Sequence, residues 1–144
     1  MRQIKFRGQK INTIDYPSNR EWVYGTGITD FLNVYPDIKG HIWLWSNYGW
    51  IEVIPSTVGH GTGLIGFANK EIYEGDMVKF KGMYKGIIVW REDHAEFGIK
   101  WREGTEREGT EREWTASLGI YEADCFEIIG TIHDDKLQSE SRGK

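Results

Sequence analysis

The sequence has very few of the residues that build cross-linked, metal-caged or membrane-spanning proteins. It contains one cysteine, Cys125, which excludes an internal disulfide and a cysteine metal cage. Cys125 stands between Asp124 and Phe126 in an apolar stretch, and we expect it in the packed core. No apolar run approaches the ~20 residues that cross a bilayer, and the opening MRQIKFRGQK does not resemble a secretory signal. We therefore expect a protein of a reducing compartment, the cytoplasm, with no membrane partner.

Helical patterning is also missing, because no segment between glycines keeps an i, i+3, i+4, i+7 apolar stripe over three turns. Glycine and aromatic residues are abundant instead, with 18 Gly, 7 Trp, 7 Tyr and 6 Phe in 144 residues. Alternation of apolar and polar residues predicts strands in the following segments: IKFR (4–7, Ile4 and Phe6 inward), MVKFK (77–81), FGIKW (97–101) and FEIIGTI (126–132, Phe126, Ile128 and Ile132 inward). The continuous run GIIVW (86–90) predicts a strand buried on both faces, and WVYGTGITDFL (22–32) has strand composition. We predict a mainly β protein.

GTGLIG (61–66) has the G-x-G-x-x-G spacing that binds the pyrophosphate of a dinucleotide. That site needs a strand before the glycines and a helix after them, within a βαβ unit. Gly75 would end any helix that follows Gly66 within about two turns, and no crossover helix is predicted. We interpret the glycines as part of a turn cluster that supplies positive φ before the next strand, and we expect no cofactor.

The charge pattern gives modest support to nucleic-acid binding. The formal net charge is −4, which offers no general attraction to a phosphate backbone, although the first ten residues carry +4. A second basic stretch interleaves lysines with aromatic rings, and its candidate contacts are Lys79, Lys81, Tyr84 and Lys85. Lysines on strands also protect sheet edges, so this hypothesis stays the alternative.

Two further clusters suggest a metal site. REDHAE (91–96) could gather Glu92, Asp93, His94 and Glu96, and IHDD (132–135) has similar ligand types. Both segments are also typical of solvated loops, and no histidine pair has helical i, i+4 spacing. A metal-dependent enzyme is therefore the less favoured hypothesis, and we expect no metal and no catalytic residues.

The segment REGTEREGTERE (102–113) repeats a charged pentapeptide and contains no apolar residue. It cannot bury a face, so we expect a charged, solvated loop there, and a polar tail at 136–144.

One long stretch resembles a known family. TVGHGTGLIGFANKEIYEGDMVKF (57–80), followed by GIIVW, resembles the signature of the YopX family of phage and prophage proteins. The family pattern has T-V-G, T-G-L, a polar turn, and K-E-I-Y-E-G-D before a valine-containing strand, matched here by 57–59, 62–64 and 70–78. The opening MRQIKFRGQK and the later FEIIGTIHDD are also similar to the family. GFANKE replaces the family's usual D-K-N-G-K-E turn, and the 102–113 repeat is outside its pattern.

The resemblance implies a small Src-homology-like β-barrel in the C-terminal half, an origin in a phage or prophage, and no established enzymatic activity. Closely spaced glycine turns agree with a small barrel. In Glu74-Gly75-Asp76 we expect a structural turn, with Gly75 at positive φ and Asp76 beside it, and we favour this over an acidic binding loop.

We therefore expect an N-terminal β region (1–55) packed on a C-terminal small barrel (56–135). The predicted function is a non-catalytic binding or assembly role in the cytoplasm of the bacterial host, with a host or phage protein as a further partner.

An aromatic-rich hairpin is the candidate interaction surface. HIWLWSNYGWIEVI (41–54) reads as two strands joined by SNYG, with the candidate residues Trp43, Trp45, Tyr48 and Trp50. If Ile42 and Leu44 face the core, alternation turns Trp43 and Trp45 outward, where a large apolar patch usually marks an interface. The alternative is a strand buried on both faces. We expect a homo-oligomer, most simply a two-fold dimer.

The first prediction is that GTGLIG binds no dinucleotide, because the helix that the site requires is missing. Titration with NAD or ATP should show no saturable binding. Saturable binding that disappears in Gly63→Val, with an unchanged circular dichroism spectrum, would contradict this.

Overall fold

The computed structural model describes residues 4–11, 21–32, 34, 37, 39–103 and 112–134. Most of the expected charged loop (104–111) and the polar tail at 136–144 lie outside these residues. The chain divides into two compact units, Met1–Gly61 and Thr62–Lys144, and the expected division at 55/56 falls inside the first. Within the described part, no helix is both long and apolar enough to cross a lipid bilayer.

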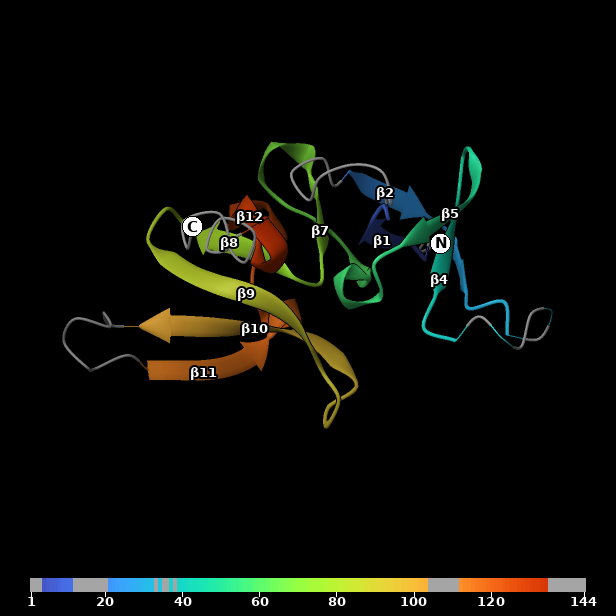
Figure 1. Cartoon of the computed structure of the whole chain (residues 1–144). Helices are drawn as coiled ribbons and strands as arrows, with labels where there is room; N and C mark the ends of the chain where they lie inside the picture. The colour runs from blue at the N-terminus through green and yellow to red at the C-terminus, as the bar shows by residue number, and fades with distance from the viewer. Residues whose placement is uncertain are drawn as a thin grey trace, which may run out of the picture. The chain divides into compact units, whose positions relative to one another are not determined.

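The prediction of a mainly β protein is confirmed, since the named elements are short antiparallel strands and three-residue 3-10 helices (Figure 1). The strands of the first unit are β1 (Phe6–Gln9), β2 (Trp22–Gly25), β3 (Gly27–Thr29), β4 (Ile42–Ser46) and β5 (Gly49–Val53). Strand β6 (Gly59–Ile65) leads into the second unit, which contains β7 (Glu71–Tyr73), β8 (Asp76–Phe80), β9 (Tyr84–Arg91), β10 (Glu96–Glu103), β11 (Arg112–Ser117) and β12 (Phe126–Thr131). The 3-10 helices are η2 (Pro55–Thr57), η3 (Phe67–Asn69), η5 (Leu118–Ile120) and η6 (Ala123–Cys125).

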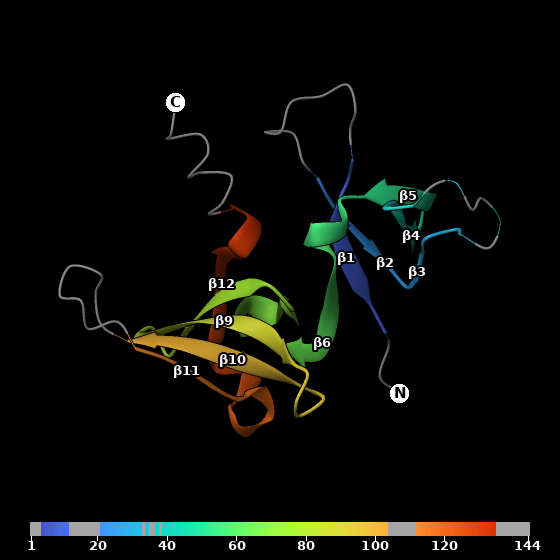
Figure 2. The same cartoon turned by 60° about the horizontal axis from the view of Figure 1, so that its bottom comes forward.

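The first unit is built around a small core of Val23, Leu44 and Val53, which are all buried. Strand β1 pairs with β2 on one side and with the beginning of β6 on the other, and β3, β4 and β5 form a three-stranded sheet (Figure 2). Gly25 allows β2 to approach β4 closely, because an added Cβ would lie 2.4 Å from the carbonyl oxygen of Trp45.

The predicted hairpin at 41–54 is confirmed as β4 and β5. Ser46 closes its turn, because its hydroxyl donates to the carbonyl of Gly49 at 2.9 Å and accepts the Tyr48 N–H at 3.1 Å. Gly49 has φ +95°, a conformation that side chains resist.

Strand β1 departs from the predicted alternation. Phe6 is half-buried, but Ile4 is exposed and Arg7 is only 5% exposed. The Arg7 guanidinium carbon lies 4.4 Å from the centroid of the Trp22 ring, so the indole of Trp22 covers the charged group. Alternation within one strand predicts that Arg7 faces solvent, because it takes no account of the strands that flank β1 on both sides.

The second unit contains a five-stranded antiparallel sheet in the order β11-β10-β9-β8-β12 (Figure 1). Its inner face carries the larger core, whose fully or nearly fully buried members are Ile72, Val78, Ile88, Ile99, Trp101, Leu118 and Phe126. As predicted, β10 turns Phe97, Ile99 and Trp101 toward one side. Among the described residues β11 and β12 remain edge strands, so the sheet is not closed and the expected barrel is not confirmed.

Two strands of this sheet differ in detail from their predictions. GIIVW is expected to be buried on both faces, but in β9 only Ile88 is buried, whereas Ile87 and Val89 on the other face are half-buried. Trp90, on the same face as Ile88, is exposed near the end of the strand. In β12 a bulge between Ile128 and Gly130 shifts the register against β8. Thr131, after the bulge, is buried, and Ile132, which lies beyond the end of β12, is exposed, so the expected inward position of Ile132 is wrong.

GTGLIG is largely strand and not the turn cluster that we expected, since β6 extends to Ile65. Gly63 does have positive φ, at +81°, and Gly66 lies so close to β12 that an added Cβ would be 2.7 Å from the Phe126 carbonyl oxygen. The element after Gly66 is η3, a three-residue 3-10 helix. Gly63 therefore lies within a strand, and Gly66 allows two backbone segments to approach each other closely.

The turn between β7 and β8 has the predicted form. Gly75 has φ +91°, its N–H donates to the carbonyl of Ile88 at 2.8 Å, and the buried carboxylate of Asp76 accepts the Tyr73 N–H at 2.8 Å. The turn is thus held by one hydrogen bond within it and by another to β9.

The second prediction concerns this turn. Gly75→Val should lower the free energy of unfolding by about 1–3 kcal/mol, because a β-branched residue is strained at positive φ. Chemical denaturation measures the change. Gly119→Val is the control, because Gly119 does not have a positive φ and an added Cβ there would lie 3.9 Å from the Ser117 hydroxyl oxygen, an ordinary contact distance. Equal stability of the two variants would refute the role of Gly75.

Candidate functional site

An aromatic face covers the outer side of the β3–β4–β5 sheet, and it consists of Phe31, Trp43, Trp45 and Trp50. Trp45 lies directly opposite Trp50 in the β4–β5 register, so their side chains share one face. Trp45 is 47% exposed and Trp50 is 44% exposed, whereas Trp43 is half-buried. Tyr48, at the turn of the same hairpin, is 92% exposed. The outward orientation proposed for Trp43 and Trp45 is thus the one that the strand adopts.

Phe31 fixes the arrangement of the indole rings. Its ring lies edge-on to Trp43 and to Trp50, with centroid distances of 5.1 Å in both cases. The rings of Trp45 and Trp50 are 5.2 Å apart and tilted by 60°. Phe31 has φ +55°, which is unusual for a bulky residue, and its N–H donates to the Thr29 hydroxyl at 3.1 Å. The ring contacts therefore hold a backbone conformation that the residue alone disfavours.

One edge of the aromatic face is polar. His41 stacks on Trp43 with ring centroids 5.9 Å apart, and its Nδ1 lies 2.5 Å from a carboxylate oxygen of Glu52. Gly27 stands opposite Trp45 in register and leaves the neighbouring indoles uncovered. Among the described residues that pair in register with the three tryptophans, none is lysine or arginine. The face is thus apolar, with the His41–Glu52 pair at its edge and no lysine or arginine among these register partners, which does not suit a phosphate backbone.

The candidate nucleic-acid contacts all lie on the β8–β9 hairpin, but on different faces. Lys79 and Lys85 are opposite each other in register and share one face. Tyr84 pairs with Phe80 on the other face, and the Lys81 ammonium lies 5.4 Å from the centroid of the Phe80 ring. A nucleic-acid strand whose bases stacked on Tyr84 would therefore lie on the opposite face of the hairpin from Lys79 and Lys85.

Four residues of REDHAE form pairs within their own hairpin, Arg91 with Glu96 and Asp93 with His94. Glu96 accepts a hydrogen bond from the Arg91 guanidinium at 2.8 Å, and Asp93 lies 3.1 Å from the His94 Nδ1. The hydrogen bond from His94 lowers the pKa of the Asp93 carboxyl below its ordinary value. In the described part of the chain, these residues do not form a group of three converging metal-ligand atoms.

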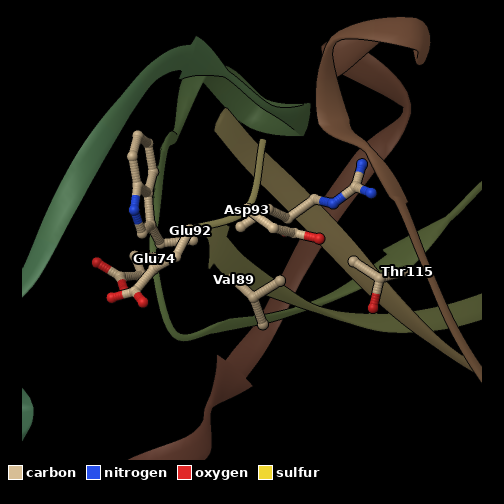
Figure 3. A pocket seen from close by; sticks show the side chains of 7 residues that line it. Glu74, Val89, Glu92, Asp93 and Thr115 are labelled. Atoms are coloured by element: carbon tan, nitrogen blue, oxygen red, sulfur yellow. The ribbon is translucent and has the colours of Figure 1, made fainter. Parts of the chain in front are cut away.

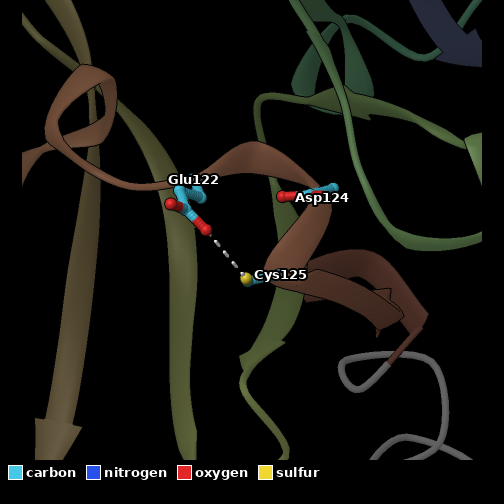
Figure 4. A group of neighbouring side chains, drawn as sticks. All are labelled: Glu122, Asp124 and Cys125. Carbon is cyan, nitrogen blue, oxygen red and sulfur yellow. Dashed lines mark hydrogen bonds between the residues drawn. The ribbon is translucent and has the colours of Figure 1, made fainter.

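A different group does converge, and the sequence analysis missed it. Ligand atoms of Glu122, Asp124 and Cys125 lie within 4.8 Å of one another around η6, and the Cys125 thiol contacts the Glu122 carboxylate at 3.7 Å (Figure 4). Cys125 is only half-buried, so its expected place in the core is wrong. Partial desolvation raises the pKa of the Cys125 thiol, and the carboxylates of Asp124 and Glu122 raise it further. A thiol held in its protonated form is a poor metal ligand and a poor nucleophile.

The comparison with protein families decides the identity of the chain. The family model described as YopX protein matches residues 5–137, which is most of the sequence and extends across both units. The chain belongs to the YopX family. The resemblance seen in the 57–80 segment is therefore confirmed, and the YopX match includes the aromatic face. No curated protein matches the chain.

The third prediction tests how this YopX protein holds its aromatic face. Phe31→Ala should lower the free energy of unfolding by about 1–3 kcal/mol, because two edge-on ring contacts are lost while the backbone still carries a Cβ at positive φ. It should also increase quenching of tryptophan fluorescence by acrylamide. Phe31→Tyr, which keeps the ring, is the control, and an alanine variant with wild-type stability and quenching would contradict the proposed role.

Proposed function

We propose that this YopX family protein is a non-catalytic binding module whose aromatic face docks on a protein surface, most simply that of a second copy. The observation that carries the proposal is the exposure of Trp45 and Trp50 side by side on a face held by Phe31. Exposed apolar patches of this kind usually mark interfaces. A two-fold dimer would let one patch cover itself.

The chemistry of the aromatic face favours a protein partner. Tryptophan and tyrosine are enriched at the centres of protein interfaces, and the polar pair of His41 and Glu52 resembles a rim. Because the ring contacts already order the indoles, docking would cost little side-chain entropy.

The proposal includes an origin in a phage or prophage and residence in the bacterial cytoplasm, both of which come from the family resemblance. A non-catalytic role is supported by the protonated thiol of Cys125 and by the local pairing of Asp93 and Glu96. Nucleic-acid binding has less support, because Lys79 and Lys85 lie on the face opposite Tyr84.

The fourth prediction is that light scattering at micromolar concentration gives twice the mass of the chain. The double variant Tyr48→Ser and Trp50→Ser should reduce this to the monomer mass. Trp114→Ser is the matched control, because Trp114 is also 44% exposed but lies in the second unit. A monomeric wild-type protein would refute self-association. A dimer that survives the double variant would exclude the aromatic face as its interface.

A further inference from the structure

The outer face of the five-stranded sheet, on the side opposite its core, carries three lysines. Val78, Ile88 and Ile99 point into the core, so alternation turns the neighbouring positions of the same strands outward. The strand register places the following residues side by side on this outer face: Met77 and Lys79 of β8, Lys85, Ile87 and Val89 of β9, Lys100 of β10 and Thr115 of β11. Lys85 and Thr115 are exposed, so the outer face meets solvent.

Protection of a sheet edge does not account for these lysines. In the order β11-β10-β9-β8-β12, the strands β8, β9 and β10 that carry them are interior, and each has a paired strand on both sides. A lysine discourages unwanted pairing only where it stands on an edge strand. The structural explanation that the sequence pattern allowed for Lys79 and Lys85 is therefore removed by the strand order.

The arrangement of the lysines concentrates positive charge. Lys79 and Lys85 lie directly opposite each other in register, which is unfavourable for two like charges. Lys79 also faces Glu127 of β12, whereas the register partners of Lys100 are uncharged. Within the described residues, one carboxylate thus stands in register with three lysines, on a chain whose formal net charge is −4. A positive surface of this kind attracts an anionic partner.

The other end of the outer face has the opposite charge. A pocket of about 680 Å³ lies there, where β9 turns into β10, and Figure 3 shows its lining, which includes the carboxylates of Glu74, Glu92 and Asp93. The one guanidinium in the lining, that of Arg91, is paired with Glu96 at 2.8 Å. This end would repel an anion, so an anionic partner is confined to the lysine end of the strands.

Apolar side chains lie between the lysines. Ile87 stands in register between Lys100 and Met77, and both Ile87 and Met77 are half-buried. None of the outer-face residues named above is aromatic, so the surface offers no ring on which a nucleic-acid base could stack. A protein segment with apolar side chains among its carboxylates matches both the charge and the apolar surface.

We propose that the lysine end of the outer face binds an acidic segment of a partner protein, whose carboxylates accept hydrogen bonds from Lys79, Lys85 and Lys100 and whose apolar side chains pack on Ile87 and Met77. An ammonium group has three donors, so a lysine can keep an existing contact and still bind a carboxylate. The outer face shares no residue with the aromatic face of the first unit, so failure of one proposal leaves the other standing.

The test uses the full chain and a capped peptide in which pairs of glutamates alternate with pairs of leucines. Binding at low ionic strength is followed through the backbone amide signals of Lys85 and Ile87 in a ¹H–¹⁵N NMR spectrum. The peptide should shift these signals saturably, and added salt should weaken the binding. A peptide with glutamine in place of glutamate should leave them unchanged. No saturable shift, an equal shift with the glutamine peptide, or tighter binding of a single-stranded oligonucleotide of equal charge would overturn the proposal.

Variants separate the outer face from general charge attraction. Lys85→Gln combined with Lys100→Gln should weaken binding of the acidic peptide about tenfold, because two of the three outer-face lysines lose their charge. Lys70→Gln combined with Lys81→Gln is the matched control and should leave the affinity within about twofold. Lys70 precedes β7, and the Lys81 ammonium lies over the Phe80 ring, so both are outside the outer face. Equal weakening by both pairs would show attraction to the net charge alone and would overturn the proposal. If a variant fails to fold, the comparison of the two peptides on the wild-type chain decides.

Discussion

Leu44 lies at the centre of β4, with Ile28 opposite it on β3 and Ile51 opposite it on β5, and it is completely buried. Because side chains alternate across a strand, this burial places Trp43 and Trp45 on the other face of the sheet. A slip of one residue would bury the indoles and expose Leu44. The aromatic face is thus a consequence of how the first unit makes its core.

Tryptophan has two different roles in this chain. In the second unit Trp101 is buried among Phe80, Tyr121 and Phe126, and its indole N–H donates to the Tyr121 hydroxyl at 3.1 Å. In the first unit Trp45 packs on another indole while almost half of its surface meets solvent. Aromatic content alone therefore cannot separate core from interface, and the partner strand and its register decide between them.

Local patterns predicted the features that depend on neighbours in sequence. The β4–β5 hairpin, the inward side of β10 and the positive φ of Gly75 all follow from alternation or from turn chemistry. Features that depend on distant strands were missed. Arg7 is buried because Trp22 covers it, and the close approach of Gly66 to Phe126 joins residues sixty positions apart.

The same contrast between features set by neighbours in sequence and features set by distant segments applies to the candidate sites. The outward tryptophans were predictable from β4 itself, but Phe31 reaches them from a loop, with a φ that no residue pattern indicated. The group at Cys125 depends on the short turn of η6. Glycine spacing indicates turns between neighbouring strands but not whether the first and last strands of a sheet pair, and among the described residues β11 and β12 do not pair.

The central claim is that the aromatic face is a surface for association, and the indole N–H signals of the tryptophans test it most directly. In ¹H–¹⁵N spectra recorded over a dilution series, the signals of Trp45 and Trp50 should shift with concentration, because association removes their rings from water. Those of Trp101, in the core, and of Trp114, exposed in the second unit, should stay constant. Shifts confined to Trp114, or no shift at Trp45 and Trp50 over a range in which the mass of the particle changes, would contradict the account.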